Sequence, residues 1–188
     1  MNKNKIRKAV ALSLLLASAG LSSIAFGADD GLTKTINIEG EVTGSGCTVS
    51  FPTSITFADT DISKLEISTA ANSTNMITPS GEMPALVLSD CAAEQQFTVT
   101  LLGTADADDA NALANGSTTT PATHVGLLMF LGNGASAIEL IPGTPSSAYT
   151  AKTDGTLNVP AWPGLVKTTD APSAGDVRIN GQLQIVYL

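Results

Sequence analysis

Aromatic and basic side chains are both scarce in this chain of 188 residues. Phe, Trp and Tyr together make up 4% of the sequence, so the core must be built mostly from Val, Ile, Leu and Ala. Only 9 Lys and Arg stand against 17 Asp and Glu. Because contacts to nucleic-acid phosphates need clustered cations, this balance excludes a nucleic-acid-binding role and disfavours anionic membrane surfaces. With 43% hydrophobic residues, the chain can form one ordinary folded domain.

Side chains that carry catalysis are also rare. His124 is the only histidine, and no Gly-x-Ser-x-Gly motif accompanies it, so a small secreted hydrolase has no support beyond that one residue. Asp106, Asp108 and Asp109 lack the later ligands of a calcium loop and are interpreted as a solvated acidic loop. We therefore expect no catalytic residue, metal or cofactor.

The N-terminus has the layout of a secretory signal peptide. Four of the nine basic residues fall within the first eight positions, and residues 9–26 are apolar or small. Small residues at Ala25 and Gly27 predict cleavage after Gly27, followed by Asp29 and Asp30. A retained transmembrane helix is the alternative, but its far end lacks a basic or aromatic anchor. The mature chain, 28–188, keeps 5 basic and 17 acidic residues, a net charge of −12.

Two cysteines remain in this exported chain, Cys47 and Cys91. An even count in an oxidising compartment predicts a disulfide, and two cysteines allow one pairing within the chain. A metal site would need more ligands, and His124 is the only histidine available. We therefore expect a structural Cys47–Cys91 bridge.

The mature chain has the pattern of an all-β protein. Short alternating or apolar runs are separated by clusters of Gly, Pro, Ser and Thr, which is typical of a β-sandwich. The expected strands are 34–42, 84–88, 97–101, 125–131 with a hairpin partner at 138–141, and 176–188. Residues 106–115, 143–147 and 159–164 are expected to form surface loops.

Two of these strands do not fit a closed domain. Residues 29–43 form a well-patterned strand directly after the cleavage site, where a chain is usually loose, and Gly44-Ser45-Gly46 follow as a joint. The last strand runs to Leu188, whereas a sandwich normally has one further strand after such a segment. The sequence therefore predicts a sheet that lacks its final strand.

Both strands are features of a known protein family that this chain resembles. The chain resembles pilin subunits of the chaperone–usher class, of the type 1 fimbrial kind, over essentially the whole mature sequence. Gly175 stands fourteenth from the end and Tyr187 is penultimate, as in the C-terminal signature of that family. The other matching segments are residues 36–42, Gly46-Cys47-Thr48-Val49, Leu88-Ser89-Asp90-Cys91, and Val125-Gly126-Leu127 with the turn Gly132-Asn133-Gly134.

The resemblance implies an incomplete immunoglobulin-like sandwich that is completed by a donor strand from another subunit. It divides the chain into a signal peptide (1–27), an N-terminal donor-strand extension (28–45) and a pilin domain (46–188). The implied partners are neighbouring pilin subunits, a periplasmic chaperone and an outer-membrane usher. The implied location is the periplasm in transit and then a fimbrium on the cell surface.

The resemblance also assigns residues to the two sides of the contact. Ile36, Ile38 and Val42 would anchor the donor strand, and Gly40 would allow close approach to the groove. On the structural alternative, residues 32–42 are an ordinary edge strand of the chain's own sheet. The residues implied for the acceptor groove or for contact with the chaperone are Gly175, Val177, Ile179, Leu183, Ile185, Tyr187 and Leu188.

The sequence thus predicts a structural subunit of an extracellular fimbria, which polymerises by donor-strand exchange and is not an enzyme. The main alternative is a self-contained exported carbohydrate-binding β-sandwich. Its sugar site would combine Trp162, which lies between two prolines, with the acidic loop.

Overall fold

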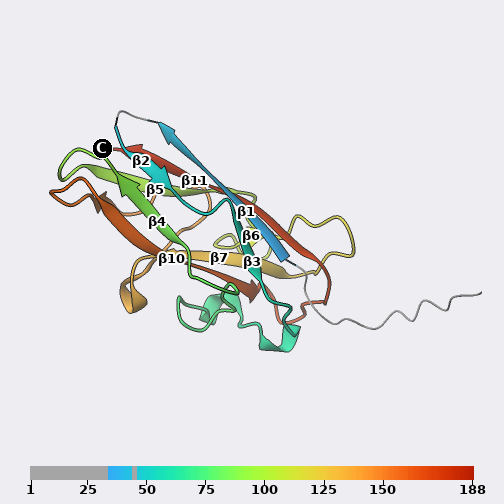
Figure 1. Ribbon diagram of the computed structural model, residues 1–188. Coiled ribbons are helices and arrows are strands. Elements are labelled where there is room, and N and C mark those ends of the chain that lie inside the picture. Colours follow the sequence, from blue (N-terminus) through green and yellow to red (C-terminus); the bar gives the residue numbers. More distant parts are fainter. Residues whose placement is uncertain (1–33, 44–45) are drawn as a thin grey trace, which may run out of the picture.

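The computed structural model describes residues 34–43 and 46–188 (Figure 1). The predicted signal peptide, its cleavage site, residues 28–33 and the joint residues 44 and 45 lie outside the described residues. Within the described residues, no helix is long and apolar enough to cross a membrane.

The described chain is built from strands and three short 3-10 helices in two sheets. One sheet has the order β3-β1-β11-β5-β9, and the other has the order β2-β4-β10-β7-β6, with β8 paired to β7. The strands are β1 (Lys34–Thr43), β2 (Thr48–Ser50), β3 (Ser54–Phe57), β4 (Ala85–Ser89), β5 (Gln96–Gly103), β6 (Leu113–Ala114), β7 (Val125–Leu131), β8 (Ile138–Glu139), β9 (Tyr149–Thr150), β10 (Leu157–Lys167) and β11 (Val177–Tyr187). The 3-10 helices are Ile62–Lys64, Ser68–Ala70 and Gly134–Ser136.

Hydrophobic periodicity explains the principal strands. All seven residues of β7 are buried, as expected for a continuous apolar run covered on both faces. Along β11, Val177, Ile179, Leu183 and Ile185 are at most 1% exposed, while the residues between them are partly or fully exposed. This alternation confirms the predicted period of two and places the core between the sheets. The hairpin partner of β7 is also confirmed, because β8 pairs with its end.

The prediction of a surface loop at 159–164 is wrong. These residues form the middle of β10, and Val159 and Ala161 are 5% and 0% exposed. Two prolines within the segment suggested a loop, because proline cannot donate to a strand ladder. The predicted loop at 143–147 lies between strands, as expected. The predicted loop at 106–115 is correct only for 106–112, because Leu113 and Ala114 form β6.

Both prolines of β10 occupy positions where no ladder hydrogen bond is needed. The strand pairs with β4 only up to Pro160 and with β7 only from Ala161. The N–H groups of Ala161 and Leu165 donate to carbonyl oxygens of the 77–84 segment, away from β7. Because successive N–H groups alternate in direction, the nitrogen of Pro163 lies on that same side, where no strand pairs with it. The nitrogen of Pro160 lies on the β7 side, before that ladder begins.

The strand order is that of an immunoglobulin-like sandwich. That fold places its first, second, fifth and fourth strands in one sheet and its third, sixth and seventh in the other. Here β2, β4, β10 and β7 are neighbours in that order, and β5, β11 and β1 follow one another in the second sheet. The strand β1 therefore occupies the place of the seventh strand, although it comes first in the sequence.

Candidate functional site: strand β1 and its groove

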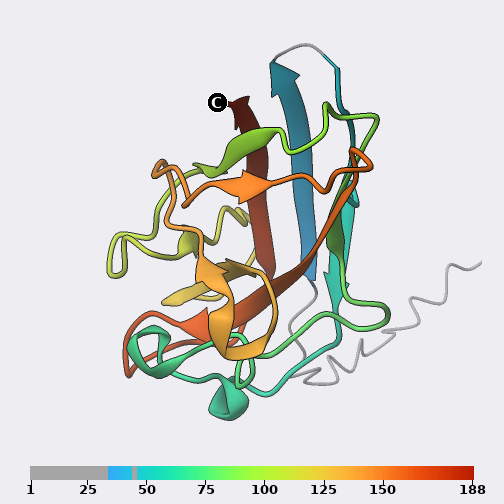
Figure 2. The same ribbon diagram turned by 90° about the vertical axis from the view of Figure 1, so that its left-hand side faces the viewer.

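The candidate site is the position of β1 between β3 and β11. Figures 1 and 2 show β1 in blue beside β11 in dark red. All ten residues of β1 pair with β11 in parallel, from Lys34 opposite Val177 to Thr43 opposite Val186. The first four residues of β1 also pair with β3 in an antiparallel ladder. In this single chain, the N-terminal extension thus completes the sheet of its own domain as a central strand, not as an edge strand.

The register places the predicted donor positions opposite the buried row of β11. Each of the four predicted donor positions pairs with an alternate residue of β11, three of which are buried. The pairs are Ile36 with Ile179, Ile38 with Gly181, Gly40 with Leu183, and Val42 with Ile185. The role of these residues toward a second chain stays a prediction.

Large and small residues alternate across this ladder. Ile38 is paired with a glycine, Gly181, and the glycine at position 40 is paired with Leu183. The two glycines lie two pairs apart along the ladder.

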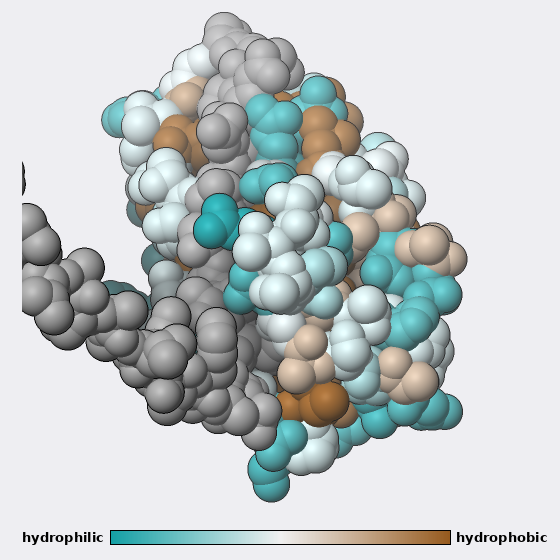
Figure 3. Space-filling view, turned by 90° about the vertical axis from the view of Figure 1, so that its right-hand side faces the viewer, coloured by the Kyte–Doolittle hydropathy of each residue, from teal (hydrophilic) through white to brown (hydrophobic). Residues whose placement is uncertain are grey.

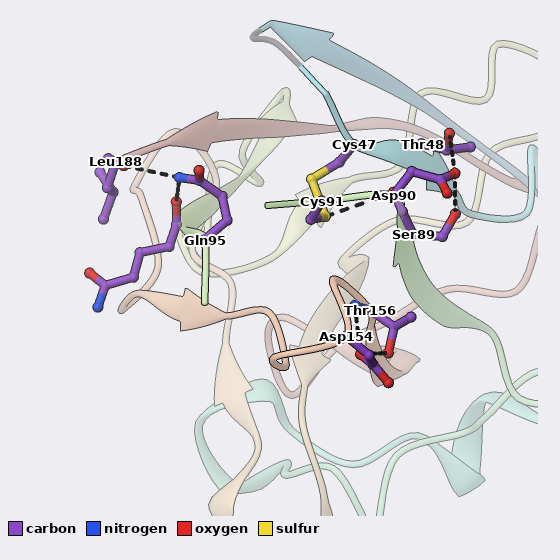
Figure 4. Close-up of a disulfide and its surroundings, with 10 residues drawn as sticks. Cys47, Thr48, Ser89, Asp90, Cys91, Gln95, Asp154, Thr156 and Leu188 are labelled. Atoms are coloured by element: carbon purple, nitrogen blue, oxygen red, sulfur yellow. Dashed lines mark hydrogen bonds between the residues drawn. A yellow bond between two sulfur atoms is a disulfide. The ribbon is translucent and has the colours of Figure 1, made fainter. Parts of the chain in front are cut away.

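The far end of the groove lies at the C-terminus of the chain. The backbone N–H of Leu188 donates to Gln96, and Nε2 of Gln95 donates to the Leu188 oxygen over 3.0 Å (Figure 4). The Leu188 side chain is 65% exposed. The hydroxyl of Tyr187 is buried near the backbone of Cys47 but makes no hydrogen bond of ordinary geometry, and this burial raises the pKa of Tyr187. Contact of Tyr187 and Leu188 with a chaperone stays a prediction.

The predicted disulfide is present between Cys47 and Cys91, whose Cα atoms are 4.3 Å apart (Figure 4). It joins the start of β2 to the end of β4, which are paired in one ladder. The carboxylate of Asp90 accepts hydrogen bonds from the hydroxyls of Thr48 and Ser89, each at 3.2 Å. The strand that follows β1 is thereby fixed to the body of the sandwich.

Gly175 lies just before β11 and packs against backbone. A Cβ atom at this position would stand 2.4 Å from the carbonyl oxygen of Thr120. The N–H of Asp176 donates to that same oxygen, and the N–H of Ala122 donates to the carbonyl of Asp176. This close approach explains a glycine here through the chain's own packing, and a contact of Gly175 with a partner stays a prediction.

Trp162 and the acidic loop, which were proposed to form a sugar site, make hydrogen bonds within the chain. The indole N–H of Trp162 donates to the carbonyl oxygen of Gly132 over 2.7 Å, and the half-buried ring packs against a second hydrophobic cluster. In the acidic loop, Oδ1 of Asp106 accepts from the N–H groups of Asp108 and Asp109. Across residues 46–188, no three His, Cys, Asp or Glu side chains are grouped to hold a metal ion.

The exposed hydrophobic side chains of the described residues are few and scattered. The larger ones are Val87, Ile141, Val186 and Leu188. The face shown in Figure 3 is largely hydrophilic or intermediate, with hydrophobic residues in small separate patches. The described part of this face thus presents no large apolar patch.

Sequence reasoning missed one element of the groove floor. Leu113 was placed in the acidic loop, but it is fully buried and forms β6. The burial of this position could have been predicted from one observation, that a single leucine stands among Ala, Asn and Asp residues.

No protein-family model matches the sequence, and no curated protein matches it. Among solved structures, the chain is similar to the P pilus rod subunit PapA, with 15% identity, a TM-score of 0.39, and coverage of 55% of this chain and 76% of that one. It is also similar to an antigen and type I fimbria protein of Burkholderia pseudomallei, with 21% identity, a TM-score of 0.44, and coverage of 82% and 94%. Both similarities are too remote to carry an assignment of function.

Proposed function

We propose that this chain is a structural subunit of an extracellular fimbria, in which β1 of one subunit inserts beside β11 of the next. The observation that carries the proposal is the place of β1. It occupies the position of the last strand of the sandwich, in register with β11 over ten residues, although it comes from the N-terminal side of the domain. Residues 28–45 are then the donor extension, and residues 46–188 are the pilin domain.

Withdrawal of β1 would open a groove that must be refilled. The facing edges of β11 and β3 would lose their ladder partner, and unpaired N–H and C=O groups would line both sides. The buried row of Ile179, Leu183 and Ile185 would lose its cover on that side. Such an edge recruits another strand or aggregates. A strand added in this way gains main-chain hydrogen bonds for affinity and side-chain pockets for specificity.

A second copy of the same chain carries a strand that fits this groove. A neighbour's β1 has the same sequence, and an extended strand keeps its alternation of faces in either direction along β11. Each subunit then gives one strand and receives one, and this head-to-tail contact generates an open filament. The predicted signal peptide supports export. The resemblance supports a periplasmic chaperone that first lends a strand to the groove, and an outer-membrane usher at which the extension of the next subunit replaces that strand.

A self-contained exported carbohydrate-binding sandwich is the alternative function. The closure of the sheet by the chain's own β1 favours a stable monomer. The two functions differ in whether β1 leaves its own groove, and this difference is measurable.

The test compares two variants of β1, each of which carries one new aspartate on a different face of the strand. Ile38→Asp puts a carboxylate in the row that pairs with the buried side of β11, whereas Asn37→Asp pairs with exposed Asn180. Loss of one buried aliphatic side chain alone removes about 1.5–3 kcal/mol. Oligomers of the mature chain that resist SDS until heated should form normally with Asn37→Asp and at least tenfold less with Ile38→Asp.

Mixing experiments distinguish the donation of β1 to a neighbouring subunit from the acceptance of a neighbour's β1. Tagged Ile38→Asp chains should still accept wild-type β1 and should appear once per oligomer, at one end. Equal oligomer formation by both variants would overturn the assignment of the donor face. A monomer that stays stable with or without residues 29–43 would favour the self-contained sandwich.

A further inference from the structure

The sequence contains three Asn-Gly pairs, at 115–116, 133–134 and 180–181. In such a pair, the backbone nitrogen of the glycine can attack the side-chain carbonyl carbon of the asparagine, because glycine has no Cβ atom to block the approach. The attack requires that the glycine N–H and the asparagine carboxamide are both free to move. The three pairs differ in this respect.

The pair at 115–116 is held at both reacting groups. Nδ2 of Asn115 donates to the carbonyl oxygens of Ala122 and Asp176 over 2.9 and 2.8 Å. Its Oδ1 accepts from the N–H of Arg178 over 2.9 Å, and the N–H of Gly116 donates to the carbonyl oxygen of Arg178 over 2.7 Å. Conversion of this amide to a carboxylate would leave two carbonyl oxygens facing a negative charge, so the native fold protects Asn115.

The pair at 180–181 is held by the sheet. Gly181 lies inside β11, which pairs with β1 on one side and with β5 on the other. Its N–H is therefore directed at a neighbouring strand, and rotation of the 180–181 peptide group would break the ladder in the middle of the sheet.

The pair at 133–134 is held much less firmly. Asn133 is exposed in the turn after β7. Within the described residues, its carboxamide makes no hydrogen bond and the N–H of Gly134 donates none. Asn133 has an extended ψ of 125°, so its peptide group must rotate before the nitrogen reaches Cγ. In the described chain, one hydrogen bond opposes this rotation, from the N–H of Ser136 to the carbonyl oxygen of Asn133 over 3.1 Å.

We propose that Asn133 is a site of intramolecular deamidation and isomerisation. The nitrogen of Gly134 bonds to Cγ of Asn133, the Cγ–Nδ2 bond breaks, and ammonia leaves with the proton of the Gly134 N–H. Water then opens the succinimide ring at one of its two carbonyl groups. The product carries either aspartate or isoaspartate at position 133, and the isoaspartate continues the backbone through its side chain. The reaction needs water alone and does not depend on the proposed function.

The residues on either side of Asn133 anchor two other parts of the chain. The carbonyl oxygen of Gly132 accepts from the indole N–H of Trp162 in β10 over 2.7 Å. The carbonyl oxygen of Gly134 accepts from the hydroxyl of Ser73 over 3.0 Å, and Ser73 is buried. Isoaspartate adds one carbon to the backbone between these two oxygens and so displaces one contact relative to the other. Trp162 is the only tryptophan of the chain, so its fluorescence reports this change.

The test is incubation of the folded mature chain in mildly alkaline buffer, followed by peptide mapping with mass spectrometry. Conversion at Asn133 should be at least tenfold faster than at Asn115 or Asn180. In urea the three rates should agree within threefold, because the same Asn-Gly sequence then reacts without the fold. A folded-state rate at Asn115 or Asn180 equal to that at Asn133 would overturn the inference, as would an Asn133 rate that rises tenfold or more on unfolding.

Asn133→Gln is the matched control. Glutamine keeps the amide but would have to close a larger ring, so conversion at position 133 and the slow change in Trp162 fluorescence should both disappear. Asn133→Asp separates charge from isomerisation, because it carries the carboxylate from the start on a normal backbone. Freshly prepared Asn133→Asp should have the initial wild-type fluorescence. A slow fluorescence change that persists in Asn133→Gln would overturn the link between position 133 and Trp162.

Discussion

Oδ2 of Asp108 lies 2.7 Å from Nδ1 of His124, and both side chains are 40% exposed. An exposed polar contact of this kind contributes about 1 kcal/mol or less, so it links the acidic loop to His124 without dominating stability. His124 also has a positive φ of 54°, a conformation that Asn adopts more readily than Ala.

We therefore expect His124→Asn to change the free energy of unfolding by less than about 1 kcal/mol and His124→Ala to cost more, because only the second adds backbone strain. Urea unfolding of both variants measures the difference. Loss of a hydrolytic activity in His124→Asn, with the fold intact, would support an enzyme and contradict a structural role for the loop.

The disulfide should supply a large share of the stability of the domain. Cys47 and Cys91 are 44 residues apart, and closing a loop of this length is worth about 4 kcal/mol in the chain-entropy model. Replacing both cysteines with Ser should lower the free energy of unfolding by about that amount and reduce the yield of folded subunit. Reduction of the wild-type protein should have the same effect, and a yield unchanged in both experiments would show that the bridge is dispensable.

Gly175→Ala should destabilise the start of β11. The new Cβ would stand 2.4 Å from a backbone oxygen, so the backbone must shift, at a cost of about 1–3 kcal/mol. Gly116→Ala is the control, because its nearest neighbour would be 3.4 Å away, an ordinary contact. Thermal unfolding should separate the two variants clearly, and similar melting temperatures would show that the 120–122 segment yields without cost.

Burial of Tyr149 predicts a loss of stability at high pH. Desolvation raises the pKa of Tyr149 to about 12, and its ring stacks on Phe97 with centroids 6.0 Å apart. The unfolded chain, with a phenol pKa of about 10, binds fewer protons than the folded chain between these values, so stability falls as the pH rises through this window. Tyr149→Phe should remove much of this fall. Spectroscopic titration of that variant isolates Tyr187, the other tyrosine of the chain.

The sequence was sufficient to predict the fold wherever one local pattern determines the structure. The alternation of residues 177–187, the apolar run 125–131 and the cysteine pair all predicted what the fold contains. Local pattern was insufficient for the 159–164 segment, because the effect of a proline depends on which neighbouring strand faces its nitrogen. Leu113 was missed for a similar reason: its side chain lies against two distant glycines, Gly103 and Gly181, which come together only when β5 and β11 pair.

The direction of β1 relative to β11 indicates whether the two strands belong to the same chain or to different molecules. Thr43 lies beside Val186, and only residues 44–46 connect it to Cys47, near Tyr187. Such a link reaches at most about 14 Å, whereas a ten-residue strand is about 33 Å long. A strand tethered in this way cannot turn around in its own groove. An antiparallel strand at that place would have to belong to another molecule, so polarity alone distinguishes a self-closed subunit from a linked one.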